Sequence, residues 1–170
     1  MPMIEMFVSA GVLDAETKAK LHRNVGRQVL EVEGGTGAPL ERAITWVFLF
    51  EVDGDAWSVG GEPVTADRQA RFLTRVTVPV GSMDDQRRED VAARVQHEIV
   101  AALGYDPGPI NCMCLINEVP TGNWSGGGLV VGFVDVMRML GLEERIFRYP
   151  ASTIREAVES PSASPSLASN

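Results

Sequence analysis

Proline at position 2 is the residue in this 170-residue sequence whose chemistry stands out first, because the chain begins Met1-Pro2. Methionine before a small residue such as proline is normally removed, and we expect its removal to leave a secondary amine at the chain terminus. A free α-amino group titrates near about 7.7 to 8.0, and burial in an apolar pocket lowers that pKa toward neutrality. Such an amine can act as a general base, or form an iminium with a carbonyl substrate. The simpler alternative is a proline that merely tolerates the first position of a strand.

The elements that would position this proline occur twice in the chain. Each copy has a short apolar strand, a glycine, an aspartate that caps a helix, and an apolar stripe at every fourth residue of that helix. In chain order the first copy is Met3–Val8, Gly11, Asp14 and Leu21, Val25 and Val29, and the second is Leu73–Val80, Gly81, Asp84 and Val91, Val95 and Ile99. From the glycines onward, matching residues lie 70 positions apart, which indicates a duplication.

A second apolar strand follows each helix, over Ile44–Val52 and Ile110–Val119, and leads into a glycine-rich hairpin that begins at Trp57 or Trp124. The pattern predicts an α/β (α+β) fold in which tandem βαβ units form a four-stranded sheet with both helices on one face. The other face also carries apolar side chains, so we expect oligomerisation to cover it. These side chains are Trp46, Phe48, Phe50, Met113 and Leu115.

We expect one domain over residues 1–149, with pseudo-repeats at about 2–64 and 72–133. A C-terminal helical segment follows over 134–149, with its helix predicted from Val134 to Leu142. Residues 150–170 are rich in Ser and Pro and are predicted to form a flexible tail.

Composition excludes several classes of function. The net charge of −8 and the pI near 4.8 argue against nucleic-acid binding. No run reaches the roughly 18 apolar residues of a membrane-spanning helix, so a soluble cytoplasmic protein is expected. Cys112 and Cys114 alternate with apolar residues and are interpreted as buried thiols in a reducing compartment.

No cofactor or metal is expected either. The glycine-rich segment 34–37 follows a helix, whereas a phosphate-binding loop precedes one. His22 and His97 lack the spacing of metal ligands.

The order of elements resembles that of the tautomerase superfamily: a strand, a glycine-containing turn, a helix, a second strand and a Gly-Gly hairpin, with a proline at position 2. Its members include 4-oxalocrotonate tautomerase, malonate semialdehyde decarboxylase and cis-3-chloroacrylic acid dehalogenase. The resemblance covers about residues 2 to 135, including the hairpin segment 57–62 and the Asn-Trp-Ser of 123–125. It implies a tautomerase (MIF-like) fold, a homotrimer, a small-molecule substrate and an active site near the start of the first strand.

The resemblance also implies supporting site residues. Trp124 and Phe133 match aromatic residues that wall the site of the decarboxylase group, and Trp57 begins the corresponding first hairpin. Glu41, followed by Arg42, stands where that group has a water-activating Asp-Arg pair. Each of these residues could instead belong to the core, a subunit interface or a surface ion pair.

Arginines that bind substrate carboxylates in related enzymes are missing from both strand-to-helix turns, segments 9–12 and 79–82. We expect Arg71 and Arg75 to replace them, because the first strand of the second copy lies beside that of the first. Arg27, on the first predicted helix, is a further candidate. Ordinary solvated or ion-paired arginines are the alternative interpretation.

The leading hypothesis is a cofactor-independent tautomerase-type isomerase that uses Pro2 as general base on small enol, keto or unsaturated acids. A decarboxylase or a hydratase/dehalogenase of the same superfamily, with Glu41 assisting, is the close alternative. A non-catalytic trimeric small-molecule-binding protein is the alternative from another class. Only the first copy would be catalytic, because the position equivalent to Pro2 is the internal Phe72.

Overall fold

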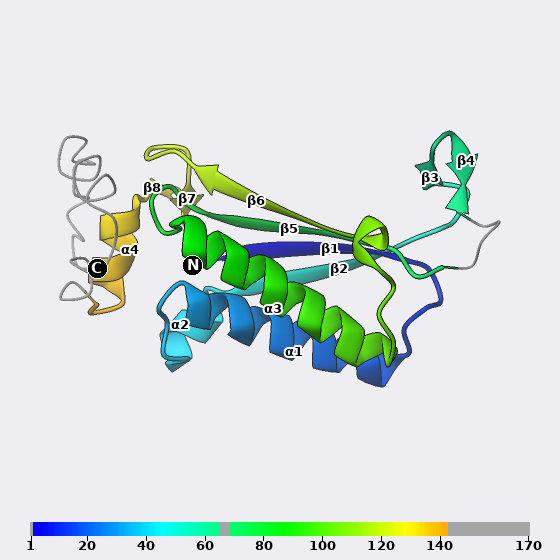
Figure 1. Ribbon diagram of the computed structural model, residues 1–170. Coiled ribbons are helices and arrows are strands. Elements are labelled where there is room, and N and C mark those ends of the chain that lie inside the picture. The colour runs from blue at the N-terminus through cyan, green and yellow to red at the C-terminus, as the bar shows by residue number, and fades with distance from the viewer. Residues whose placement is uncertain (1, 65–68, 143–170) are drawn as a thin grey trace.

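The computed structural model describes residues 2–64 and 69–142 (Figure 1). The larger elements form two consecutive strand-helix-strand units, each followed by a small hairpin, and a last short helix. In chain order they are β1 (Met3–Ser9), α1 (Ala15–Val32), α2 (Pro39–Ala43), β2 (Trp46–Val52), β3 (Ser58–Val59), β4 (Glu62–Pro63), β5 (Phe72–Pro79), α3 (Asp85–Leu103), η2 (Pro109–Asn111), β6 (Cys112–Val119), β7 (Ser125–Gly126), β8 (Leu129–Val130) and α4 (Phe133–Met139). The predicted tail, residues 150–170, lies outside the described residues.

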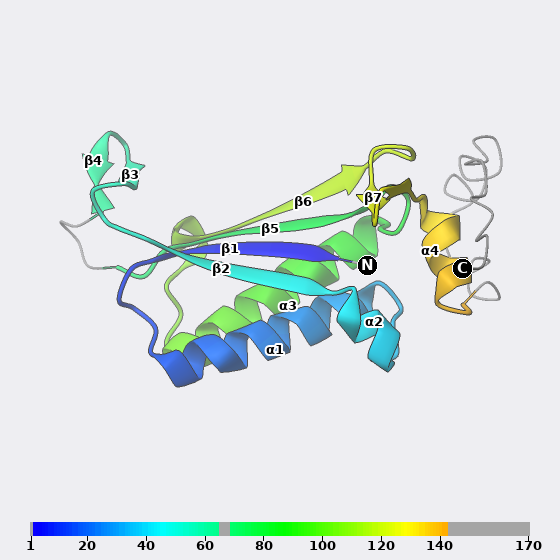
Figure 2. The ribbon, with the colours of Figure 1, turned by 180° about the vertical axis from the view of Figure 1, so that it is seen from behind.

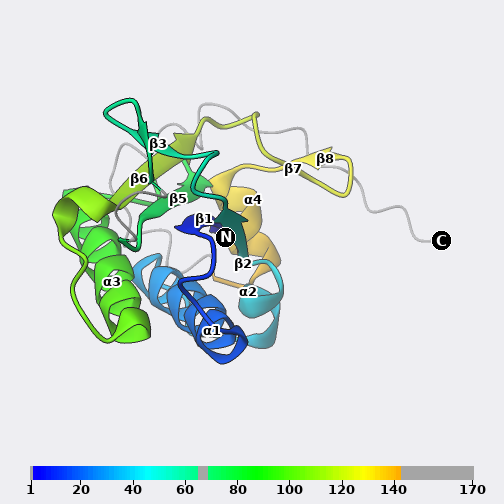
Figure 3. The ribbon, with the colours of Figure 1, turned by 90° about the vertical axis from the view of Figure 1, so that its right-hand side faces the viewer.

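The main sheet has the strand order β2-β1-β5-β6. Strands β1 and β2 are parallel, as are β5 and β6, whereas the central strands β1 and β5 run antiparallel. Figures 1 and 2 show α1 and α3 on the same face of this sheet, and Figure 3 shows them side by side. The predicted fold class, two βαβ units sharing a four-stranded sheet with both helices on one face, is therefore confirmed.

The helices begin at the predicted caps. A side-chain oxygen of Asp14 accepts a hydrogen bond from the Thr17 backbone amide at 2.7 Å, and Asp84 accepts one from the Arg87 amide at 2.8 Å. Such bonds satisfy amides that have no partner within a helix. The predicted apolar stripes are buried against the sheet, with at most 2% exposure, at Leu21, Val25, Val29, Val91, Val95 and Ile99.

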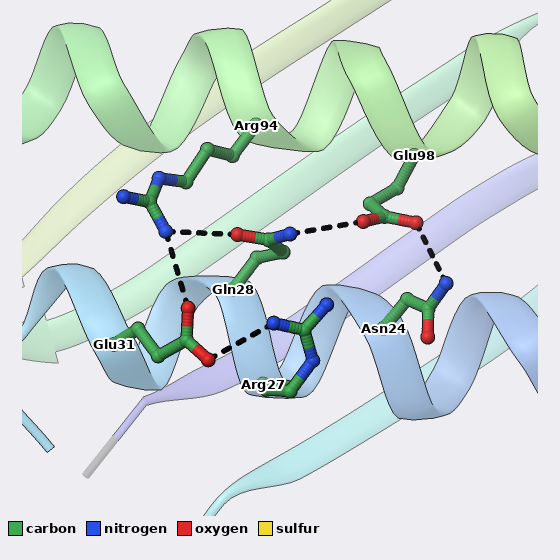
Figure 4. A network of polar contacts seen from close by, with 6 residues as sticks. All are labelled: Asn24, Arg27, Gln28, Glu31, Arg94 and Glu98. Atoms are coloured by element: carbon green, nitrogen blue, oxygen red, sulfur yellow. Dashed lines mark hydrogen bonds and ion pairs between the residues drawn. The ribbon is translucent and has the colours of Figure 1, made fainter. Parts of the chain in front are cut away.

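Polar side chains bridge α1 and α3 beside these stripes (Figure 4). The buried Glu98 carboxylate accepts hydrogen bonds from Asn24 Nδ2 at 2.8 Å and Gln28 Nε2 at 3.1 Å. Arg94 donates to Gln28 Oε1 at 2.8 Å. The two copies thus meet through non-identical partners, because Gln28 and Glu98 are themselves equivalent positions 70 residues apart.

The opposite face of the sheet, called here the open face, is apolar, and no helix or strand of the described residues covers it. Strand β2 places an aromatic row on it, in which the Phe48 and Phe50 rings stack with centroids 6.1 Å apart. Side chains of Trp46, Phe48, Phe50, Met113 and Leu115 are between 38% and 55% exposed. The predicted apolar second face is therefore present.

The structure shifts some predicted boundaries. The segment expected to start a strand at Ile44 instead ends helix α2 there, and β2 begins at Trp46. Likewise a 3₁₀ turn occupies 109–111, so β6 begins at Cys112. The C-terminal helix spans Phe133–Met139, where Val134 to Leu142 was expected. The predicted division into a domain, repeats and tail stays a prediction.

Candidate active site

Pro2 directly precedes β1, and it lies close to the end of helix α2. Its carbonyl accepts a hydrogen bond from the Trp46 amide at 3.2 Å, which fixes the residue against the start of β2. The proline is buried. It lies at the same end of the sheet as α4 and the hairpin β7–β8 (Figures 1 and 2).

A cavity of about 330 Å³ opens beside this proline and is called here the Pro2 cavity. Apolar side chains from the start of the sheet, from α2 and from α4 form most of its wall. Its described lining residues are Pro2, Met3, Ala43, Ile44, Trp46, Trp124, Ser125, Gly126, Val131, Asp135, Val136 and Met139. The predicted pair of Pro2 and Trp124 is thus brought together.

Asp135 is the acidic residue that the described lining contributes, and sequence reasoning missed it. Its Oδ2 accepts a hydrogen bond from the Gly132 amide at 2.9 Å, and its Oδ1 lies 3.5 Å from the Arg138 guanidinium. The first bond is half of a capping box at the start of α4, which orients the carboxylate. A glycine followed three residues later by an aspartate, just before an apolar helix, was the signal available in the sequence.

Glu41 does not line the Pro2 cavity. It is 2% exposed, and its Oε2 accepts hydrogen bonds from the Thr36 amide at 2.7 Å, the Thr36 hydroxyl at 3.0 Å and the Ala38 amide at 2.9 Å. Burial alone would raise the pKa of this carboxyl, but these hydrogen bonds outweigh it and hold the pKa below its ordinary value. The geometry indicates a residue that organises the loop before α2.

Phe133 is buried next to the Pro2 cavity without lining it. Together with Glu41 it borders a separate cavity of about 30 Å³ behind α4, and it packs against Met137. Val136 lines both cavities. Phe133 therefore supports the position of α4, the helix that carries Asp135.

Arg71 and Trp57 lie at the other end of the sheet. Because β5 runs antiparallel to β1, its beginning lies beside the end of β1, where the Arg71 amide donates to Ser9 Oγ at 3.1 Å. Trp57 stands between β2 and the hairpin β3–β4, which Figures 1 and 2 place far from the N-terminus. Neither residue is brought together with Pro2 within the chain.

Arg75 lies between these two ends, on the open face. It is exposed, stands opposite Glu5, and places its guanidinium carbon 5.4 Å from the centroid of the Phe7 ring, a cation–π distance. Along β5 it is two residues from Thr77, the partner of Met3 in the Pro2 cavity. Arg75 is therefore outside the described lining but faces the same side of the sheet as Met3.

The described part of the chain holds no cluster of three or more His, Cys, Asp or Glu residues suited to a metal ion. Nor does any helix within it have the length and apolar character needed to cross a bilayer. Both cysteines are half-buried free thiols, and desolvation raises the pKa of each to about 11.

This arrangement, two βαβ units related by a pseudo-twofold axis, is the tautomerase (MIF-like) fold. The solved structure of N1, a member of the cis-3-chloroacrylic acid dehalogenase (cis-CaaD) family, is similar over 86% of this chain and 99% of its own, with a TM-score of 0.64 and 16% identity. The F6 fused 4-OT wild-type asymmetric trimer matches 82% of this chain and 98% of its own, with a TM-score of 0.62 and 19% identity.

Pt0534 inactivated by 2-oxo-3-pentynoate is a third similar structure, with a TM-score of 0.61 and 19% identity over 74% of this chain and 92% of its own. No protein-family model matches the chain. No curated protein matches it either. The structural likeness confirms the resemblance to the tautomerase superfamily at the level of the fold.

Proposed function

We propose that this protein is a cofactor-independent tautomerase-type isomerase whose general base is the amine of Pro2, exposed by removal of Met1. Its substrates are small enol, keto or unsaturated acids. One observation carries the proposal: the buried Pro2 borders a cavity of about 330 Å³ whose wall is mostly apolar. Such a cavity holds a small organic molecule and keeps bulk water from the amine.

The reaction requires a base that gives back the proton it takes. In an apolar wall the charged form of an amine is disfavoured, so Pro2 would carry a free electron pair near neutral pH. That pair accepts the hydroxyl proton of an enol, and the resulting ammonium delivers a proton to the adjacent carbon as the carbonyl forms. The hydroxyl of Ser125, in the same wall, offers a hydrogen bond to the carbonyl oxygen.

Asp135 favours a second candidate, a hydratase or decarboxylase. A carboxylate in the Pro2 cavity can orient a water molecule, while a protonated Pro2 supplies the proton that the product needs. This role was expected of Glu41, whose Oε2 is instead bonded to the loop before α2. In the second candidate, Asp135 takes that role.

The protein is further proposed to act as a homotrimer. The open face leaves large aromatic and aliphatic side chains uncovered, including Phe48 at 38% and Leu115 at 48% exposure, and such a face favours association. The similar fused 4-OT structure is described as a trimer. Arg75, which lies on this face, is the proposed partner for a substrate carboxylate.

Two measurements test the proposal in sequence. Intact mass of the purified protein establishes whether Met1 has been removed. Ketonisation of phenylpyruvate enol, followed by absorbance, is then compared between the wild type and Pro2→Ala, and we expect a loss of at least about a hundredfold in kcat/KM. Pro63→Ala, at an exposed proline of β4, is the matched control and should retain the wild-type rate.

Labelling provides an independent readout. The alkyne of 2-oxo-3-pentynoate accepts an amine by conjugate addition: the nitrogen bonds to the carbon distal to the carbonyl, and the amine proton passes to the neighbouring carbon. We expect one reagent per chain, located on the N-terminal peptide. Equal turnover by wild type and Pro2→Ala, or a chain that keeps Met1 in its native host, would refute Pro2 as the base. Binding without turnover would favour the non-catalytic binding protein.

A further inference from the structure

A second concave site lies on the other side of α2 from Pro2. It is a groove of about 490 Å³ between the outer face of α1, the loop after α1, and the start of β2. It is called here the arginine groove. Its described lining residues are His22, Arg23, Gly26, Arg27, Leu30, Glu31, Thr36, Gly37, Arg42, Thr45 and Val47.

Arginines from two elements line this groove. Arg23 and Arg27 are one turn apart on α1 and both are exposed, and Arg42 comes from α2. Arg42 donates to the Gly37 carbonyl, which holds its side chain against the loop. The groove is thus rich in donors suited to an oxyanion, on a chain whose net charge is −8.

Glu31 neutralises only part of this charge. Its carboxylate pairs with Arg27 at 2.9 Å and also with Arg94 of α3 at 3.3 Å, so one negative group is shared between two guanidinium groups. Three arginines and one glutamate therefore line the groove. The lining therefore carries more positive than negative side chains, with the Glu41 carboxylate bonded behind Thr36 as a further negative group.

Apolar atoms form the floor of the groove. Helix α1 lies close to β2 at Gly26, where a Cβ atom would come within 3.1 Å of Val47 Cγ2. Leu30 and Val47 both border the space. Because the groove is several times larger than an inorganic oxyanion, its shape and lining suit a molecule with an anionic head and an apolar body.

We propose that the arginine groove is a binding site for a small organic oxyanion, distinct from the Pro2 cavity. The anionic group, a phosphate monoester or a carboxylate, lies between Arg23 and Arg42, and the apolar body lies over Leu30 and Val47. Helix α2 separates the two sites: Arg42 borders the groove, and the next residue, Ala43, borders the Pro2 cavity. The site does not depend on the proposed catalytic role of Pro2.

Titration calorimetry with phenyl phosphate, benzoate and neutral phenol tests this proposal on the full-length protein. We expect saturable binding of at least one anion, with the better one identifying the head group, and none of phenol. Arg23→Ala and Arg42→Ala should each weaken anion binding about tenfold, as loss of a charged hydrogen bond predicts. Lys20→Ala, on the same helix but outside the described lining, should leave it unchanged.

The outcomes separate cleanly. Pro2→Ala should bind the anions as the wild type does, and 2-oxo-3-pentynoate labelling of Pro2 should proceed in their presence. Absence of saturable binding at millimolar concentration would overturn the proposal. So would equal affinities in the wild type, Arg23→Ala and Arg42→Ala, provided that thermal melting shows the variants to be folded.

Discussion

Glu5 and Arg75 lie directly opposite each other in the antiparallel pairing of β1 and β5, and they are also equivalent residues of the two copies, 70 positions apart. The pseudo-twofold axis of the sheet therefore passes between them. An acidic and a basic residue now occupy this pair of positions, at the centre of the open face. The two copies therefore differ in charge at the pseudo-twofold axis that relates them.

Arg75→Ala should raise the KM for phenylpyruvate about tenfold and leave kcat within about threefold, because a guanidinium that binds the substrate carboxylate contributes to binding and not to proton transfer. The methyl ester of phenylpyruvate lacks that charge and provides the matched control. Steady-state kinetics on both substrates measure the effect. If the KM values for acid and ester respond equally, Arg75 does not recognise the carboxylate.

Asp135→Asn removes a negative charge from the Pro2 cavity, and so should lower the pKa of the Pro2 amine. If the free amine is the base, activity rises with pH as the amine loses its proton, and the acid limb of the kcat/KM profile should move to lower pH. If protonated Pro2 is the acid of a hydratase in which Asp135 orients the water, turnover should fall at every pH, and the basic limb of the remaining activity should move to lower pH. An unchanged profile would show that Asp135 is not coupled to the amine.

Glu41→Gln should destabilise the fold by about 1–3 kcal/mol at pH 7, because the buried carboxylate accepts hydrogen bonds from the Thr36 and Ala38 amides. Hydrogen bonding holds the folded-state pKa of Glu41 below the ordinary 4.5. The carboxylate therefore stabilises the protein fully above about pH 4.5, and the gain is lost as the pH falls through the lower, folded-state pKa.

Urea unfolding at pH 7 and pH 3 measures this difference, which should shrink at the lower pH. Glu62→Gln, at an exposed position of β4, is the control and should change stability by less than about 0.5 kcal/mol. Turnover by the folded Glu41→Gln variant should remain within about twofold of wild type. A loss of turnover approaching that of Pro2→Ala would restore Glu41 to the reaction.

Leu115→Lys should convert the proposed trimer into monomers, because it places a charge in the middle of the open face. Leu40→Lys makes the same change on α2 at nearly the same exposure, 47% against 48%, but away from that face. Sedimentation velocity distinguishes the two species. A trimer that survives Leu115→Lys and dissociates with Leu40→Lys would place the interface elsewhere.

The main strands and helices were predictable because the same pattern of residues occurs in both copies. Caps at Asp14 and Asp84 and the stripes that include Val25 and Val95 depend on local spacing, and a constant offset of 70 residues relates one copy to the other. Two independent appearances of a weak pattern reinforce each other. The burial of both stripes against one face of the sheet follows from that pattern.

Most of the site was less predictable, for two reasons. Asp135 belongs to α4, and among the described residues no α-helix follows the hairpin of the first copy, so no repetition drew attention to it. Glu41 depends on the three-dimensional course of the loop at Thr36, which the copy with the shorter loop lacks. Arg71 was expected to bind substrate near Pro2, but that expectation overlooked the direction of the strand: the twofold axis reverses β5 and carries its beginning to the other end of the sheet.

Phe72, the counterpart of Pro2, is 1% exposed and packed in the core together with Ala70. The end of the sheet at Phe72 is therefore filled by apolar side chains, whereas the end at Pro2 contains a cavity. To create a second N-terminal amine at the equivalent position, the chain would have to be cut before Phe72 and the buried side chains there replaced by smaller ones. The protein would then lose stability in proportion to the volume of the cavity that is created.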